Sequence, residues 1–172
     1  MIRPATPKDA ESIAAIHVHS WQETYRGILP DPLLDGLSVG VRSSQWYKLL
    51  ITPQGPLVFV DEDKGELAGF IAGAERREKL LTQDAEISAL YVARKAQRKG
   101  IGTALMQQLA IGLRERDLNS LCLWVLDGNE GARKFYEALG GALIGERKEN
   151  LGGHDFTERA YGWDRLDELA AE

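Results

Sequence analysis

Hydrophobic residues recur along the chain at two spacings, one typical of helices and the other of strands. Apolar positions three and four residues apart predict helices over residues 7–27, 38–50, 102–117 and 130–139, with a short helix starting at Asp31 and Pro32. Runs rich in β-branched and aromatic residues predict strands over residues 1–4, 57–60, 67–73, 86–92 and 121–126, and a hairpin within residues 142–164. The charged tail should fray or form a last helical turn.

The order of these strands also predicts how they pair. The turn sequence of residues 61–66 predicts a hairpin, which residues 86–92 continue as a third antiparallel strand. Residues 121–126 are apolar throughout, as in a strand covered on both faces, and they follow a crossover helix. They should therefore lie parallel to residues 86–92. We expect a mixed α/β sheet, mostly antiparallel, flanked by helices.

Composition and charge narrow the class of protein. A chain of 172 residues with 44% hydrophobic residues fits one globular domain over residues 1–172. It has no apolar run of about eighteen residues and no signal-peptide pattern, so we expect a cytoplasmic protein with no membrane partner. The net charge of −5 argues against a nucleic-acid partner. Cys122 lies in an apolar run, where packing explains it better than nucleophilic chemistry.

A basic loop with two glycines joins the third antiparallel strand to the helix that follows. Amides in the first turn of a helix have no partner inside it, so those of residues 99–104 can bind an anion. Gly100 and Gly102 let the backbone approach that anion, and positive charge comes from Arg94, Arg98 and Lys99. A P-loop sequence is absent, and a dinucleotide fold needs a glycine where this chain has Leu105. The loop predicts a pyrophosphate site of another kind.

Three segments in fixed order carry a family resemblance. They are Leu90-Tyr91-Val92, then Gln97-x-x-Gly100-x-Gly102, then Asn129-x-x-Ala132-x-x-Phe135-Tyr136-x-x-Leu139-Gly140. In this order they resemble the GNAT superfamily of acetyl-CoA-dependent N-acetyltransferases, whose middle segment wraps the pyrophosphate of coenzyme A. The close resemblance covers roughly residues 85–141, and residues 20–30 resemble a bacterial subgroup that acts on small molecules.

The resemblance implies the GNAT fold and an acetyl-CoA site, with no metal. In that fold the two central strands splay apart at a bulge near Leu90 to Val92, and the pantetheine arm bonds to the free backbone there. The residues implied to bind acetyl-CoA are Leu90, Tyr91, Val92, Gln97, Arg98, Lys99, Gly100, Ile101, Gly102, Thr103, Asn129, Ala132, Phe135 and Tyr136. Asn129 can also cap the next helix, and the two roles are compatible.

Acetyl transfer to an amine needs a base, a polarised carbonyl and a partner for the departing thiolate. Glu86 lies eleven residues before Gln97, at the offset of the basic glutamate in histone-type members, and is the predicted base. The alternative is that Glu86 is only a solvated strand residue. The other candidate bases are Glu23, His17 and His154. The resemblance implies that the N–H of Val92 stabilises the oxyanion that forms during the attack. It also implies that Tyr136 protonates the departing thiolate or donates a hydrogen bond to it. The alternative is that Tyr136 only packs beside Phe135.

The acceptor site is predicted from the first two helices, which form one of its walls in the GNAT fold. Trp21, Glu23 and Tyr25 are the candidates to line it, although aromatic residues here could simply pack helices on a sheet. We expect a small molecule with a primary amine. A protein N-terminus or lysine as acceptor, and a non-catalytic coenzyme A sensor, stay open. A cleft capped by Trp21, Tyr25 and the last hairpin would favour the small molecule, and the resemblance also implies a homodimer.

Overall fold

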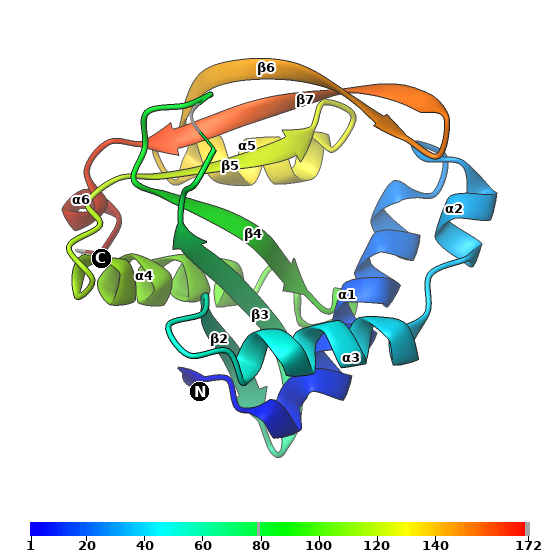
Figure 1. Cartoon of the computed structure of the whole chain (residues 1–172), viewed down its shortest axis with the longest axis horizontal. Helices are drawn as coiled ribbons and strands as arrows, with labels where there is room; N and C mark the ends of the chain where they lie inside the picture. Colours follow the sequence, from blue (N-terminus) through cyan, green and yellow to red (C-terminus); the bar gives the residue numbers. More distant parts are fainter. Residues whose placement is uncertain (79, 171–172) are drawn as a thin grey trace.

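A seven-stranded sheet runs through the middle of the protein and carries helices on both faces (Figure 1). The computed structural model describes residues 1–78 and 80–170. The strands follow the order β1-β2-β3-β4-β5-β7-β6 and are β1 (Ile2–Pro4), β2 (Leu57–Asp63), β3 (Glu66–Glu75), β4 (Ala85–Val92), β5 (Leu121–Leu126), β6 (Ala142–Leu151) and β7 (His154–Trp163). The helices are α1 (Ala10–Tyr25), α2 (Asp31–Asp35), α3 (Val39–Leu50), α4 (Ile101–Arg114), α5 (Glu130–Ala138) and α6 (Leu166–Ala170), with 3-10 turns η1 (Pro7–Asp9) and η2 (Arg94–Ala96). The mixed, mostly antiparallel sheet confirms the predicted fold class.

Several helices and strands end at positions that differ from those predicted by the hydrophobic pattern, because residues with left-handed backbone conformations lie near their ends. The β2–β3 turn consists of Lys64 and Gly65, with φ of 52° and 83°, so both strands extend into the predicted turn of residues 61–66. Helix α4 ends at Arg114 rather than Asp117, because Asp117 is left-handed with φ of 60°. These differences change the lengths of elements and leave their order as predicted.

The charged tail forms the expected helical turn. Leu166 and Leu169 of α6 are buried against the core that α4 covers. Residues 171–172 lie outside the described residues. None of the helices in the described part of the chain is long and apolar enough to span a membrane.

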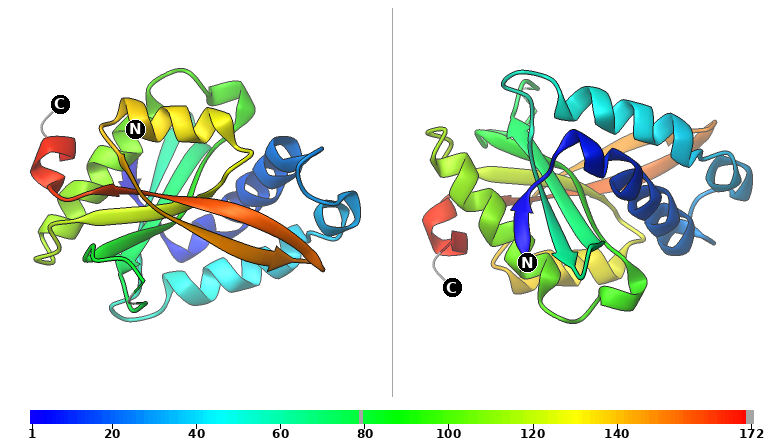
Figure 2. Two further views of the ribbon diagram at one scale, coloured as in Figure 1. Left: turned by 90° about the horizontal axis from the view of Figure 1, so that it is seen from above. Right: turned by 90° about the horizontal axis from the view of Figure 1, so that it is seen from below.

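Two apolar cores lie on opposite faces of the sheet, and Figure 2 shows α3 and α5 on opposite sides of it. One core joins α4, α5 and α6 to the sheet and includes Ile71, Ile87, Leu105, Met106, Leu109, Leu113, Leu121 and Leu123. The other joins α1 and α3 to the sheet and includes Ile13, Ala14, Trp46, Val60, Phe70 and Ala72. Each large apolar side chain buried in this way contributes about 1.5–3 kcal/mol to folding.

The centre of the sheet contains a wedge-shaped gap between β4 and β5. These strands are parallel, as predicted, but they pair only at Ala85 with Leu121 and at Glu86 with Cys122. Beyond Glu86 the two strands diverge, and β5 continues instead along β7. We call the space between the diverging parts of β4 and β5 the wedge. Figure 1 shows α1 and α2 standing across its open end.

A bulge in β4 lies at Ser88, two residues before the implied position near Leu90 to Val92. Across the β3–β4 ladder Gly73 pairs with Ile87 and Ala72 pairs with Ala89, which leaves Ser88 as the extra residue. The extra residue exchanges the two faces of the strand. Ala85 and Ile87 face α4 before it, while Ala89 and Tyr91 face α1 and α3 after it. The bulge thus sets which side of the wedge each β4 side chain occupies.

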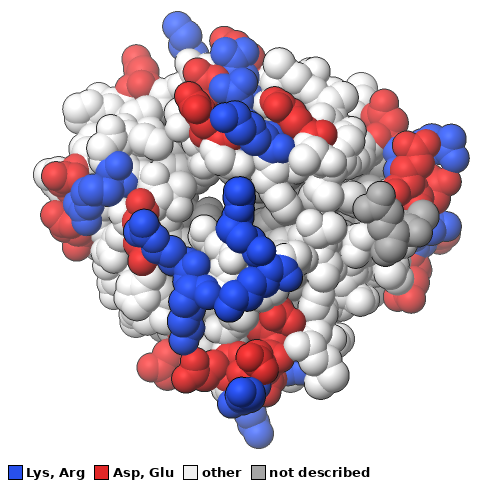
Figure 3. Space-filling view, turned by 180° about the vertical axis from the view of Figure 1, so that it is seen from behind, with Lys and Arg blue, Asp and Glu red and all other residues white. Residues whose placement is uncertain are grey.

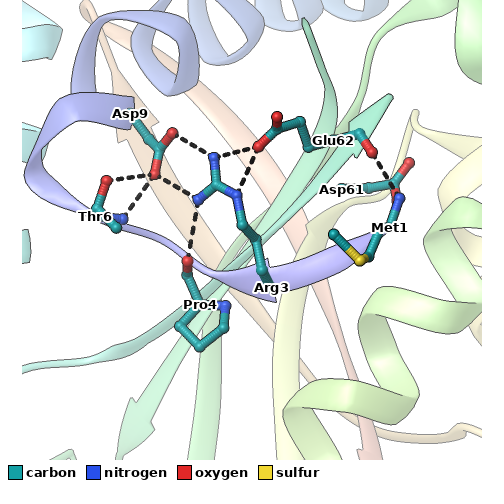
Figure 4. A network of polar contacts seen from close by, with 7 residues as sticks. All are labelled: Met1, Arg3, Pro4, Thr6, Asp9, Asp61 and Glu62. Atoms are coloured by element: carbon teal, nitrogen blue, oxygen red, sulfur yellow. Dashed lines mark hydrogen bonds and ion pairs between the residues drawn. The ribbon is translucent and has the colours of Figure 1, made fainter. Parts of the chain in front are cut away.

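An ion-pair network holds the N-terminal strand to the start of α1 (Figure 4). Arg3 donates two hydrogen bonds of 2.9 Å to the carboxylate of Asp9 and a third, of 2.6 Å, to Glu62. Asp9 also accepts hydrogen bonds from the backbone N–H and hydroxyl of Thr6. The Arg3 guanidinium, above all, lowers the pKa of Asp9 from 3.8 to about 2.

We expect Asp9→Asn to destabilise the protein by about 2 kcal/mol at pH 7, because the folded state binds the ionised carboxylate. The pKa of Asp9 is lower in the folded state, so its stabilisation is present above pH 4 and is lost as the pH falls toward 2. Urea unfolding at pH 7, 4 and 2.5 should therefore show the gap between native and variant closing in acid. Asp63→Asn, at an exposed position, is the control. A gap that stays constant with pH would contradict the role of this ion pair.

Candidate active site

The backbone of β4 presents free hydrogen-bonding groups to the wedge. The N–H of Ala93 donates to the carbonyl of Ala68, which makes these two residues a hydrogen-bonded pair in the antiparallel β3–β4 ladder. Hydrogen-bonded and non-bonded pairs alternate, so the N–H and C=O groups of Val92 and Leu90 point away from β3. The carbonyl of Val92 accepts a 3.0 Å hydrogen bond from the side-chain amide of Gln97, in agreement with that orientation. The N–H groups of Leu90 and Val92 therefore face the wedge.

The start of α4 offers a second set of free amides. Gly100 caps the helix in the left-handed region, with φ of 80°, and the N–H of Ala104 makes the first helical bond to its carbonyl. The amides of residues 101–103 precede that bond and have no partner within the helix. An anion placed here meets these amides and the positive end of the helix.

A close packing contact explains why residue 102 is a glycine. A Cβ added at this position would lie 3.1 Å from the ring of Phe135, which comes from α5. The sequence predicts that Gly102 opens the backbone to an anion, and the structure adds that it lets α5 pack against the first turn of α4. The loop and the helix that carries Tyr136 are thus fitted to each other.

Positive charge gathers on the same side of the molecule. Figure 3 shows Lys and Arg side chains grouped beside a recess in the middle of the face opposite that of Figure 1. Figure 2 places α5 and the η2–α4 segment on that face. The segment supplies four exposed basic residues, which are Arg94, Lys95, Arg98 and Lys99. Lys95 already pairs with Glu66 at 2.9 Å.

Tyr136 and Asn129 lie beside the open part of the wedge on the β5 side. Asn129 caps α5, since its Oδ1 accepts a 3.2 Å hydrogen bond from the N–H of Ala132. Tyr136 is 8% exposed and packs at 5.4 Å from Phe135 and 6.1 Å from Trp163, between ring centroids. Burial raises the pKa of Tyr136 above its usual value, and the nearby phenol of Tyr25 raises it further. Both the packing and the capping interpretations of the sequence are therefore observed.

Glu86 stands at the closed end of the wedge, where β4 and β5 last pair. Its side chain is half-buried. Burial raises its pKa, although the neighbouring cations Arg147 and Arg76 partly oppose this effect. A carboxylate with a raised pKa is a stronger base than an ordinary one.

An aromatic cluster on α1 fixes the other face of β4. The indole N–H of Trp21 donates to the hydroxyl of Tyr91 at 2.7 Å, and His17 stacks on the Tyr91 ring at 4.9 Å. Nδ1 of His17 accepts a hydrogen bond from Trp46, and burial lowers the pKa of His17 to about 4. His17 is therefore neutral at pH 7, and its one acceptor nitrogen is already in use.

The remaining α1 candidates separate into buried and exposed residues. Tyr25 is 7% exposed and packs against Leu126 at the end of β5, together with Leu29 and Leu34. Glu23 lies on the exposed side of the same helix. Trp21 therefore lies against β4, Tyr25 lies against the end of β5, and Glu23 faces solvent.

Cys122 is fully buried beside Glu86 in the sheet. Burial raises the pKa of its thiol to about 11, so it stays protonated at pH 7. This agrees with packing rather than nucleophilic chemistry.

The profile of the Acetyltransferase (GNAT) family matches residues 15–141 of this chain. The protein belongs to the GNAT family. It is 30% identical over 168 residues to a Bacillus subtilis protein named as an uncharacterized N-acetyltransferase, YuaI, with 98% of this chain and 95% of that protein covered. The structure of yncA from Salmonella typhimurium with its cofactor acetyl-CoA has a TM-score of 0.73 at 19% identity, over 97% of this chain and 94% of that chain. The PaiA N-acetyltransferase of Thermoplasma acidophilum in complex with coenzyme A has a TM-score of 0.69 at 21% identity, covering 92% and 96%.

GNAT proteins use acetyl-CoA, and the residues of this GNAT chain fit that donor. The unpaired N–H groups of Leu90 and Val92 can extend the sheet to an amide-bearing arm. The amides of residues 101–103 and the basic segment beside them suit a pyrophosphate. The described residues contain no group of three or more His, Cys, Asp or Glu side chains that could hold a metal ion.

Sequence reasoning missed a polar group across the wedge of this GNAT protein. The Arg147 guanidinium lies 4.2 Å above the Trp124 ring and donates a 2.7 Å hydrogen bond to Glu158. Among the described residues, the indole N–H of Trp124 is buried without a hydrogen-bond partner. A tryptophan inside an otherwise aliphatic strand is the one local signal for this group, and its partners come from β6 and β7.

Proposed function

We propose that this GNAT protein transfers the acetyl group of acetyl-CoA to a primary amine of a small molecule. The observation that supports a small acceptor is the wall formed where the α1–α2 segment meets the β6–β7 hairpin. Leu33, Leu151 and Phe156 pack against the cluster that contains Tyr25 and Leu126. The acceptor side of the wedge is thus bounded by β4, by α1 and by the hairpin, an enclosure that favours a compact acceptor over a protein chain.

Glu86 is the proposed base. An alkylamine with a pKa of about 10.4 is neutral in only about one molecule in a thousand near pH 7.4, so a base must remove its proton. The raised pKa of Glu86 reduces the difference in basicity between carboxylate and amine. His17 is not suited to this role because it is buried and accepts a hydrogen bond from Trp46.

Val92 and Tyr136 are proposed to donate hydrogen bonds to the thioester of acetyl-CoA. The N–H of Val92 faces the wedge and can donate to the oxygen that gains charge when the amine attacks, a contact worth about 3 kcal/mol in other enzymes. Tyr136 has a raised pKa, well above the value of about 8.5 for a thiol, so it can donate a hydrogen bond to sulfur but is a poor acid toward it. We therefore favour the hydrogen-bond role for Tyr136.

A titration calorimetry experiment with acetyl-CoA, followed by an amine panel, tests the proposal. We expect micromolar or tighter binding, and release of free thiol with at least one small primary amine from a panel of amino acids, polyamines and aminoglycosides. Peptides with a free N-terminus or an internal lysine form the comparison panel. Tight binding with turnover only on peptides would make the protein a protein acetyltransferase.

Two further outcomes would overturn the proposal. Tight binding of acetyl-CoA with no turnover on any amine would support a coenzyme A sensor instead. If the folded protein does not bind acetyl-CoA, its similarity to acetyltransferases would be limited to the fold. The proposal also keeps one domain over residues 1–172, a cytoplasmic location and a homodimer as expectations, the last of which sedimentation equilibrium can test.

A further inference from the structure

Glu86 and Trp124 lie on the same face of the sheet, on neighbouring strands. Ala85 and Ile87 pack into the core that α4 covers, so Glu86 between them faces the opposite side, where α1 and α3 lie. Glu86 pairs with Cys122 of β5, and Trp124 is two residues further along that strand. Because alternate residues of a strand share a face, Trp124 lies on the Glu86 side.

Arg147 reaches the same face from β6. Glu158 of β7 pairs with both Leu126 of β5 and Arg147, and residues paired across an antiparallel ladder share a face. Leu126 is two residues beyond Trp124, and the Arg147 guanidinium lies 4.2 Å from the centroid of the Trp124 ring. Two residues span about 7 Å along a strand, and neighbouring strands lie about 4.8 Å apart. The Trp124 ring and Glu86 are thus within reach of one small molecule.

The Arg147 guanidinium is held at one side and free at its end. Its Nε donates a 2.7 Å hydrogen bond to Glu158 and lies 3.2 Å from a carboxylate oxygen of Glu149. Among the described residues, its two terminal NH2 groups have no hydrogen-bond partner. The side chain is 31% exposed, so these groups are open to a ligand. The paired N–H groups of a guanidinium match the two oxygens of a carboxylate.

The unused polar groups on this face are of two kinds. The end of Arg147 and the buried indole N–H of Trp124 are donors, and within the described part of the chain neither has an acceptor. The Glu86 carboxylate is an acceptor that makes no hydrogen bond or ion pair with any described residue. The carboxylates of Glu158 and Glu149 are already engaged by Arg147. The face therefore suits a molecule that has an amine at one end and oxygen atoms at the other.

We propose that the free end of Arg147 binds a carboxylate of the acceptor, so that the preferred substrate is an amino acid rather than a simple amine or a polyamine. The amine lies at Glu86, and the carboxylate lies at the guanidinium that stacks on Trp124. Arg147 sets specificity in this arrangement and takes no part in the transfer itself. This inference rests on the proposed function and gives the chemical class of its substrate.

Amino acids and their α-carboxamides test the proposal, because the two members of each pair differ only in the charged group. Thiol release measures kcat/KM, and the native protein should prefer the acid by at least about tenfold, since the amide loses a charge-assisted pair of hydrogen bonds. The amine of the amide is the less basic of the two, which favours the amide. A preference for the acid therefore cannot come from amine basicity. Calorimetry of the coenzyme A complex with each pair makes the same comparison without turnover.

Arg147→Gln should reduce the preference for the acid to less than about twofold, while kcat/KM for the amides stays within about threefold of native. Arg147→Lys keeps the charge without the paired N–H groups and should restore part of the preference. Arg165→Gln is the matched control, since Arg165 is 66% exposed and pairs with Asp167 near the end of the chain. A purely structural role of Arg147 would lower the activity on acids and amides alike.

Two results would overturn the inference while the proposed function stands. One is a native protein that acetylates amides or polyamines at least as well as amino acids, a comparison that needs no variant. The other is an Arg147→Gln protein, shown to be folded by its thermal unfolding, that keeps the native preference for the acid. If the native protein acetylates no small amine, the proposed function fails and the inference fails with it.

Discussion

Glu86→Gln lowers acetyl transfer to the accepted amine by about 10²- to 10⁴-fold, the range that a positioned general base contributes. Glutamine has nearly the same size and cannot accept a proton, so binding of acetyl-CoA should stay within about twofold of native. Steady-state kinetics with the amine identified by the panel measures the first effect, and calorimetry measures the second. Glu11→Gln, at an exposed position of α1, is the control for a change of charge.

The pH profile separates a base from a structural carboxylate. Glu86 must be ionised to act, and burial raises its pKa, so kcat/KM should fall as the pH drops through a value above that of an ordinary glutamate. Glu86→Gln should lack this acidic limb and keep only the titration of the acceptor amine. A variant that retains activity within about threefold of native would place the base elsewhere.

Gly102→Val has the second large effect, an expected loss of acetyl-CoA affinity of at least about 100-fold. A Cβ at Gly102 lies 3.1 Å from the Phe135 ring, so the larger valine side chain requires that ring or the start of α4 to shift. This displaces the free amides of residues 101–103, whose hydrogen bonds to an anion are individually worth about 1.5–3 kcal/mol.

Gly40→Val is the matched control for Gly102→Val. Beyond its own helix backbone and chain neighbours, a Cβ at Gly40 comes no nearer than 3.8 Å to another atom, and this residue lies on α3, away from the loop. Calorimetry with acetyl-CoA, with circular dichroism to check folding, compares the two variants. Tight binding by a folded Gly102→Val protein would mean that the start of α4 does not hold the pyrophosphate.

The donor half of the site could be predicted from sequence because its signals are local. Gly100 lies within a few residues of the basic side chains and of the helix start, and the strand that precedes it ends in the apolar residues 89–92. The bulge at Ser88 could not be predicted in the same way. Residues 85–92 are almost all small or apolar, so no alternation of polar and apolar residues marks where the strand changes face.

The acceptor half depends on contacts between distant residues. Tyr25 of α1 packs with Leu126 of β5, and nothing near either residue in the sequence indicates the other. The insertion of β7 between β5 and β6 likewise depends on distant residues, and it brings Arg147 over the Trp124 ring and Glu158 within reach of Arg147. The same holds for Gly102, since the sequence shows a glycine and only the fold shows that Phe135 is the reason.

The wedge also means that this sheet has an unpaired edge in its interior. Unpaired strand edges are normally places where another polypeptide can add a strand, which leads to aggregation. Here α1 and α2 stand across the opening, and Tyr25 of α1 packs against Leu126 on the β5 side. The fold therefore keeps an unpaired β-edge available to a thin, flexible ligand while it excludes the strand of a second protein molecule.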